Sequence, residues 1–193
     1  RSVAELARRV GYLFQDPDRG LFERSVRREV AFGPRQLGRR GERLGAAVAR
    51  ALALTRLTSR EGHPYDLRPS ERRWLALASV LAMETPVLVL DEPSRGLDHG
   101  GKRHLLALLK ALRAAGRSLL LISHDLALVA ELADRVFVLE DGRLSGGAAR
   151  EVLLDEATLE RAGLDLPPAA RLAKDLGLRP VLTEAELFAA RPT

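Results

Sequence analysis

The sequence of 193 residues contains no cysteine, and lysine occurs only at Lys102, Lys110 and Lys174. Without cysteine, the chain can form neither a disulfide framework nor a thiolate metal site, a composition that suits a reducing compartment. Its apolar runs stop short of the roughly 18 to 20 residues that a membrane-spanning helix needs. The opening stretch SVAELARRV does not have the pattern expected of a signal peptide, and the sequence shows no internal repeat or low-complexity segment. The hydrophobic content of 46% then indicates a globular chain with one core, or a core and a small subdomain.

The charge of the chain is basic but mixed. Lysine and arginine together number 31 against 26 acidic residues, which gives a formal net charge of +5. A clustered excess of arginine would indicate a nucleic acid or an anionic membrane surface as partner. Because the arginines are spread among the acidic residues, scattered surface charge is the favoured interpretation, and a dedicated polyanion-binding patch is the alternative.

Hydrophobic patterning predicts an α/β fold. The apolar runs Val87–Leu90 and Ser118–Ile122 show no alternation, which is typical of parallel strands buried on both faces. A helix between them, from His104 to Ala115, makes the unit strand, helix, strand. The other predicted elements are a strand at 10–14, helices at 25–37, 42–57 and 69–83, a hairpin of strand 135–140 with a strand from 143, and helices and loops beyond 149.

Polar residues that could bind a metal ion or take part in catalysis follow the two apolar strands. VLVLDEP delivers Asp91 and Glu92 to the carboxyl edge of the sheet, where ligands bind in open parallel sheets. One carboxylate can hold Mg²⁺ and its neighbour can polarise a water for attack on a phosphoryl group. LLLISHD ends with His124, an imidazole that can share a hydrogen bond near the same place. Taken alone, each of these residues also fits a helix cap, a turn or a structural histidine.

With the turn SRGLD between them, these residues resemble the motifs of ATP-binding-cassette (ABC) ATPases. Asp91 and Glu92 are similar to the Walker B aspartate and the catalytic glutamate, Ser94–Asp98 to the D-loop, and His124 to the switch histidine. Gln15, after the strand GYLF, resembles the Q-loop glutamine. The resemblance implies ATP and Mg²⁺ as cofactors, with Glu92, His124 and Gln15 in catalysis. It also implies that Asp91 and Gln15 hold the magnesium ion, and that Ser94 and Asp98 contribute to nucleotide binding.

Within that family, two segments are similar to the energy-coupling-factor importers of vitamins or of cobalt and nickel ions. They are FQDPDRGLF with the following SVRREVAFGPRQLG, and the tail GLDLPPAARLAKDLGL. This resemblance implies a peripheral subunit on the cytoplasmic face of the cell membrane, paired with a second ATPase and a transmembrane coupling subunit. Asp16, Asp18 and the arginines at 24, 27 and 28 are candidates for contacting that subunit, or form a solvated surface.

No phosphate-binding loop precedes Gln15, and we expect it to lie upstream of Arg1 in the parent protein. Gly96, Gly101 and Lys102 satisfy G-x-x-x-x-G-K, but Arg103 stands where Ser or Thr is needed. We interpret this match, and the pair at 146–147, as coincidence. Without the loop, the chain by itself is expected to bind ATP weakly or not at all.

The stretch LRPSE departs from the family's LSGGQ signature. Leu67 keeps the frame, which places Arg68, Pro69, Ser70 and Glu71 over S, G, G and Q. Proline and glutamate suit the first turn of a helix, but the ring of Pro69 and the carboxylate of Glu71 oppose phosphate binding. In the family's head-to-tail dimers the signature serves the partner's nucleotide. We therefore expect an asymmetric pair in which the partner's site is the impaired one.

The resemblance as a whole predicts an ABC ATPase core that is incomplete at its N-terminus. The core comprises residues 1–15 and 85–149, the Q-loop and helical subdomain 16–84, and a C-terminal helical extension 150–193. One alternative is a degenerate cassette that supports a competent partner without hydrolysing ATP. A weaker alternative is a DNA-repair ATPase of the ABC type, but no sustained heptads are present and no nucleic-acid partner is expected.

Overall fold

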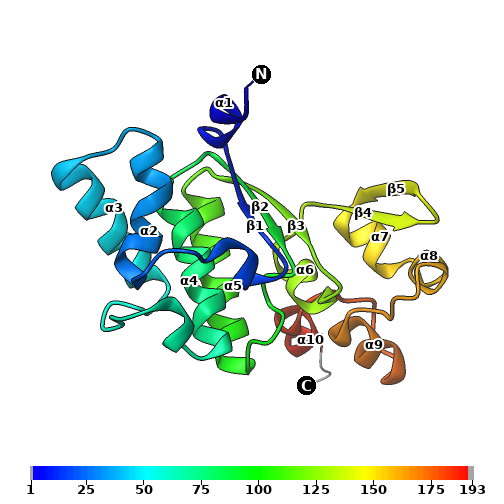
Figure 1. The fold of residues 1–193 in the computed structure, drawn as a ribbon. Helices are drawn as coiled ribbons and strands as arrows, with labels where there is room; N and C mark the ends of the chain where they lie inside the picture. Colours follow the sequence, from blue (N-terminus) through cyan, green and yellow to red (C-terminus); the bar gives the residue numbers. More distant parts are fainter. Residues whose placement is uncertain (1, 191–193) are drawn as a thin grey trace. The chain divides into compact units, whose positions relative to one another are not determined.

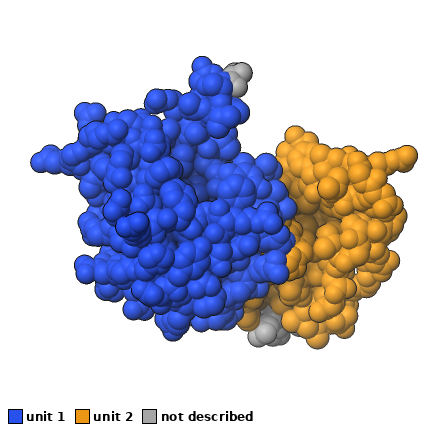
Figure 2. Space-filling view, in the orientation of Figure 1, with its two compact units in different colours: residues 1–122 blue, residues 123–193 orange. Residues whose placement is uncertain are grey.

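The computed structural model describes residues 2–190. The chain divides into two compact units, residues 1–122 and residues 123–193 (Figure 2). The first unit contains, in chain order, α1 (Val3–Ala7), β1 (Val10–Leu13), η1 (Pro17–Gly20), α2 (Val26–Gln36), α3 (Gly41–Leu54), η2 (Pro64–Asp66), α4 (Pro69–Ala82), β2 (Val87–Asp91), α5 (His99–Ala114) and β3 (Ser118–Ile122) (Figure 1). The predicted division into 1–15 with 85–149, 16–84 and 150–193 stays a prediction.

The sheet of the first unit is parallel, with the strand order β1-β2-β3. Leu88 and Leu90 of the central strand are 0% exposed. On the opposite face, the register places Tyr12 beside Val89 and Val89 beside Leu120. Tyr12 and Leu120 are 41% and 55% exposed. The sheet therefore has one buried face and one open face in the described part of the chain.

This result corrects the prediction that both apolar strands are buried on both faces. The four residues of β3 that follow Ser118 are all apolar, yet burial alternates along the strand, and Ile122 is 47% exposed. The physical reason is that α4 packs on the face that contains Gly11 and Leu88, whereas Tyr12 and Leu120 on the other face stay exposed.

The buried face of the sheet lies unusually close to α4 at Gly11. A Cβ atom at this position would lie 2.7 Å from Cγ1 of Val80 and 2.9 Å from Oγ1 of Thr85. Glycine in a strand often marks such a close backbone approach. The contact fixes the distance between β1 and α4, and hence between the residues that follow each of them.

Helices α2, α3 and α4 pack against one another beside the sheet (Figure 1). The hydroxyl of Ser25 caps α2 by accepting a hydrogen bond from the N–H of Arg28 at 3.4 Å. Glu29 of α2 is 2% exposed and accepts hydrogen bonds from the N–H groups of Phe22 and Glu23 at 2.9 and 2.7 Å. Burial raises the pKa of this carboxyl group, against the opposing effect of the two N–H donors.

Helix α5 begins earlier than predicted. It starts at His99 rather than His104, because a carboxylate oxygen of Asp98 accepts a hydrogen bond from the N–H of Gly101 at 2.6 Å. The glycines at 100 and 101 have poor helix propensity, and the cap outweighs it. The other predicted helices agree with the structure to within three residues at each end.

The second unit contains α6 (Leu126–Leu132), β4 (Arg135–Glu140), β5 (Arg143–Ala148), α7 (Ala149–Leu154), α8 (Glu156–Arg161), α9 (Pro168–Asp175) and α10 (Glu184–Ala189). Strands β4 and β5 form the predicted antiparallel hairpin. A small core joins α9 and α10 through Ala169, Ala173, Val181 and Leu187. Among residues 2–190, no helix is both long and apolar enough to span a bilayer.

Candidate functional site

Asp91 is the last residue of the central strand β2, at the carboxyl edge of the sheet. It is half-buried, on the open face, and the register places it beside Ile122 of β3. The hydroxyl of Tyr12 donates a hydrogen bond to Oδ2 of Asp91 at 3.4 Å. Sequence reasoning did not single out Tyr12, although its place one residue before the end of β1 was a usable signal.

Glu92 follows Asp91 in a sharp turn. Its φ is +47°, in the left-handed region that non-glycine residues rarely adopt. Its N–H donates to the carbonyl of Ile122 at 2.8 Å, so the turn is tied to the end of β3. Its carbonyl accepts a hydrogen bond from Nη1 of Arg73 at 3.0 Å.

The same arginine also reaches the residue that resembles the Q-loop glutamine. Nη2 of Arg73 donates to the carbonyl of Gln15 at 3.0 Å. Gln15 is exposed and lies two residues after the end of β1. The predicted residues Gln15, Asp91 and Glu92 therefore lie at neighbouring strand ends of one sheet, and Arg73 connects the first to the third. Nothing in the sequence distinguished Arg73 from the adjacent Arg72.

The turn at 94–98 leads from β2 into α5. Ser94 is 3% exposed, and Asp98 is the N-cap of the helix. Gly101 and Lys102, which belong to the chance phosphate-loop match, lie in the first turn of α5. Because the N–H of Gly101 already bonds to Asp98, this segment is a capped helix start and not a loop of free N–H groups.

His124 lies in the second unit, two residues after the end of β3, and is exposed. The next residue, Asp125, caps α6 by accepting a hydrogen bond from the N–H of Leu128 at 3.3 Å. The position of His124 relative to Asp91 and Glu92 stays a prediction, since these residues belong to different units.

The stretch Arg68–Glu71 forms the start of α4. Arg68 has an extended backbone, and Pro69 is the first helical residue. The carboxylate of Glu71 turns back and accepts hydrogen bonds from the N–H of Arg68 at 3.0 Å and from Nη2 of Arg68 at 3.3 Å. It also forms an ion pair with Arg60. Hydrogen bonding to Arg68 lowers the pKa of Glu71 to about 2, with Arg60 adding to the effect. The helix N-terminus thus already holds an anion, supplied by its own chain.

The donor set at the sheet edge suits one kind of metal. In residues 2–190 there is no group of three or more His, Cys, Asp or Glu residues that could hold an ion. This excludes a cage built from the described residues alone, but Mg²⁺ usually binds one or two carboxylates and completes its shell with phosphate and water oxygens. A single half-buried carboxylate such as Asp91, with the amide side chain of Gln15 just after the end of the adjacent strand β1, fits that pattern.

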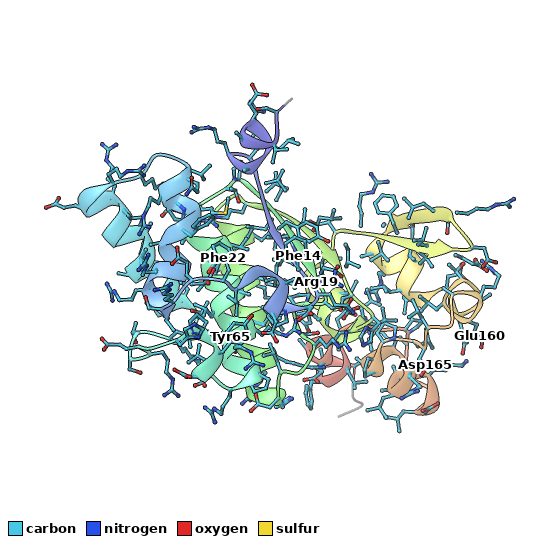
Figure 3. All side chains as sticks on the ribbon, viewed as in Figure 1. Phe14, Arg19, Phe22, Tyr65, Glu160 and Asp165 are labelled. Atoms are coloured by element: carbon cyan, nitrogen blue, oxygen red, sulfur yellow. The ribbon has the colours of Figure 1, made fainter. Side chains whose placement is uncertain are left out.

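Exposed aromatic rings lie just before Gln15, in the segment that follows it, and in η2. Phe14, Phe22 and Tyr65 are 50%, 61% and 50% exposed, and all three are labelled in Figure 3. The hydroxyl of Tyr65 donates to the carbonyl of Leu21 at 3.2 Å, which joins η2 to this segment. Asp18 forms an ion pair with Nε of Arg72 at 2.9 Å. Aromatic rings bordered by charged residues are typical of protein-binding surfaces.

Comparisons with known proteins agree with this architecture. No family model matches the chain. It is 44% identical over 189 residues to a Pyrococcus horikoshii protein named as an ABC transporter ATP-binding protein, an alignment that covers 97% of this chain and 72% of the relative. It is 34% identical over 191 residues to the energy-coupling factor transporter ATP-binding protein EcfA2 of Clostridium perfringens, covering 96% and 67%. The chain spans only 30% of a longer Methanosarcina mazei relative that is also named as an ABC transporter ATP-binding protein.

A solved structure gives the same result. The structure of cbiO1 from Clostridium perfringens, described as part of the ABC transporter complex cbiONQ, superimposes with a TM-score of 0.69 and 31% identity. The match covers 88% of this chain and 69% of that one.

Proposed function

The chain belongs to the family of ABC transporter ATP-binding proteins, and we propose that it hydrolyses ATP to drive an importer of the energy-coupling-factor type. The observation that carries the proposal is the arrangement at the sheet edge, where Gln15 and the pair Asp91 and Glu92 end neighbouring parallel strands. The 34% identity to EcfA2 supports the importer type. Vitamins or transition-metal ions are the proposed cargo, selected by membrane subunits, with this chain at the cytoplasmic face of the membrane.

In the proposed reaction, Asp91 and Gln15 would hold the Mg²⁺ ion that accompanies ATP. The ion would supply positive charge beside the phosphates, where negative charge develops. Glu92 orients and polarises the attacking water, and His124 shares a hydrogen bond with the transferred phosphoryl group. Ser94 and Asp98, in the turn between β2 and α5, are proposed to contribute to nucleotide binding.

The start of α4 supports an asymmetric pair of ATPases. The family's signature motif contacts the nucleotide of the other subunit, so Arg68–Glu71 would serve the partner's ATP. The ionised carboxylate of Glu71 lies where a phosphate would otherwise meet the helix N-terminus. A homodimer would carry this defect at both sites. We therefore propose pairing with a second, different ATPase or cassette.

The exposed rings at Phe14, Phe22 and Tyr65 support a site for the transmembrane coupling subunit. Phe14 and Phe22 flank Asp16 and Asp18 along the chain, and Tyr65 bonds to Leu21 of the same segment. The exposed arginines at 24, 27 and 28 follow this segment. A short amphipathic helix would bury its apolar face on the rings and pair its charges with these charged residues.

The test uses the full-length protein, alone and coexpressed with the ATPase encoded beside it. We expect strong ATP hydrolysis only from the pair, and loss of about 100-fold or more of the turnover at this chain's own site in Glu92→Gln, because a general base is removed. Glu42→Gln, at an exposed position in the first turn of α3, is the matched control for the charge change. Strong hydrolysis by this protein alone would exclude the asymmetric pair.

A second candidate function is a degenerate cassette that supports a competent partner without turnover of its own. The occupied helix start at Glu71 is the observation that favours it. The two functions give opposite results in the same variant, since Glu92→Gln in a passive cassette would leave the ATP turnover of the intact pair unchanged.

A further inference from the structure

The side chain of Arg73 connects helix α4 to the ends of two strands of the sheet. It lies on α4, and its two terminal nitrogens donate to two backbone carbonyls that are far apart in sequence. Nη1 bonds to Glu92 and Nη2 to Gln15, each at 3.0 Å. The planar guanidinium has a fixed fork of donors, so one side chain can hold both carbonyls in one relative position.

The backbone of Glu92 needs such support. Its φ of +47° is costly for any residue with a Cβ atom. The cost is greater before a proline, because the ring of Pro93 disfavours helical-type conformations in the preceding residue. Strained residues of this kind persist only where the surroundings fix them from several sides.

Hydrogen bonds to Ile122, Arg95 and Arg73 help to hold the backbone of Glu92 in this conformation. Its N–H donates to Ile122 at 2.8 Å, and its carbonyl accepts from the N–H of Arg95 at 3.2 Å as well as from Arg73. The first two contacts are neutral backbone hydrogen bonds. The third involves a charged donor, and such bonds are about twice as strong as neutral ones.

The surroundings of Arg73 strengthen this contact. The side chain is half-buried, and burial together with the nearby charge of Arg95 lowers its pKa, whereas Asp16 and Glu92 act in the opposite direction. A partly desolvated guanidinium forms stronger hydrogen bonds than one in water. The loss of this side chain would also leave two carbonyls at the site without their charged donor.

We propose that Arg73 is a positioning residue for this chain's ATPase site. It fixes the direction in which Glu92 leaves the strand and ties the Gln15 segment to the same point. Both hydrogen bonds of the Arg73 guanidinium described above go to backbone carbonyls, so we propose that it acts through Glu92 and Gln15 and not on the substrate. The inference rests on the proposed function, in which Glu92 acts on the attacking water and Gln15 holds the magnesium ion.

Hydrogen exchange tests the structural part without any need for activity. We compare Arg73→Gln with Arg72→Gln, a matched control on the same helix that bonds to the carbonyl of Leu67 and to Asp18. Loss of a charged hydrogen bond should speed exchange of the Glu92 and Arg95 amides about tenfold in Arg73→Gln. Arg72→Gln should affect only the segment around Asp18. Equal exchange of the Glu92 and Arg95 amides in the two variants would overturn the proposal.

Kinetics in the full-length pair test the positioning role. Arg73→Gln should lower kcat about tenfold with little change in KM for ATP, because substrate contacts remain and only the orientation of the water-activating group is lost. Arg73→Lys keeps the charge but not the fork, so it should recover only part of kcat. Thermal unfolding followed by Trp74 fluorescence confirms that each variant is folded.

The outcomes separate the two proposals. Unchanged kcat in Arg73→Gln, with turnover lost in Glu92→Gln, overturns the positioning role and leaves the proposed function intact. Unchanged turnover in Glu92→Gln overturns the proposed function, and the exchange data still decide whether Arg73 holds the turn.

Discussion

Replacing Glu71 by glutamine should make the stability of the first unit less dependent on pH. Arg68 and Arg60 lower the pKa of Glu71 from 4.5 to about 2. In the unfolded chain this carboxyl group takes up its proton near pH 4.5, before the folded protein does. The ionised form therefore stabilises the fold fully above pH 4.5, and the stabilisation is lost as the pH falls from 4.5 towards 2.

The size of the effect follows from the shift and from the exposure of the partners. At about 1.4 kcal/mol for each pKa unit, the shift corresponds to about 3 kcal/mol as an upper limit. The side chains of Arg68 and Arg60 are 75% and 46% exposed, and solvent screens such pairs strongly. We therefore expect Glu71→Gln to lower the free energy of unfolding by about 1 to 2 kcal/mol at pH 7.

Urea unfolding at pH 7, 4 and 3 measures this difference. The only tryptophan, Trp74, lies on α4 close to Glu71, so its fluorescence follows the first unit. The difference between wild type and Glu71→Gln should decrease from pH 7 to pH 3, with most of it lost at pH 3. Glu42→Gln removes the same charge from the first turn of α3 and should change the free energy of unfolding by less than about 0.5 kcal/mol. A Glu71→Gln difference of equal size at pH 7 and pH 3 would refute the electrostatic explanation.

Two glycines provide further predictions. Gly11→Ala should lower the free energy of unfolding of the first unit by about 1 to 3 kcal/mol, because the new methyl group would lie 2.7 Å from Val80. The control is Gly20→Ala, in which no atom lies within 4 Å of the new methyl group, and both variants are measured by the urea unfolding assay with Trp74 fluorescence. Gly146→Ala should open the β4–β5 hairpin, because the methyl group would collide with the carbonyl of Val136 and with Phe137, whereas Gly147→Ala has room. Amide exchange in β4 and β5 distinguishes these two variants, and equal protection in both would contradict the steric argument.

Local signals predicted the elements of the fold well. Ser25 and Pro69 begin helices as their residue types favour, and the turn at 141–142 connects the expected hairpin. These features depend on a few neighbouring residues, which the sequence displays directly. The start of α5 was predicted five residues too far along the chain, and this error had a local cause as well. The capping residue Asp98 is followed closely by two glycines, at 100 and 101, that obscure the helical pattern.

The contacts of the candidate site were harder to predict. Arg72 and Arg73 are adjacent and identical in type, yet one bonds to Leu67 and Asp18 and the other to Gln15 and Glu92. The rotation of α4 relative to the sheet decides which arginine reaches the strand ends, and close packing at Gly11 sets that geometry. The sequence motifs identified which residues do the proposed chemistry but not which residue supports them.

Two side chains near the start of α4, Glu71 and Arg73, are directed towards two different proposed sites. Glu71 and Arg73 are two positions apart, and at 3.6 residues per turn such side chains leave the helix in nearly opposite directions. Glu71 turns to the exposed arginine side chains at the helix start, the side proposed to meet the partner's nucleotide. Arg73 turns to the carbonyls at this chain's own sheet edge. A shift of this first turn would therefore act on both proposed sites together, whereas substitutions at Glu71 and at Arg73 should separate them.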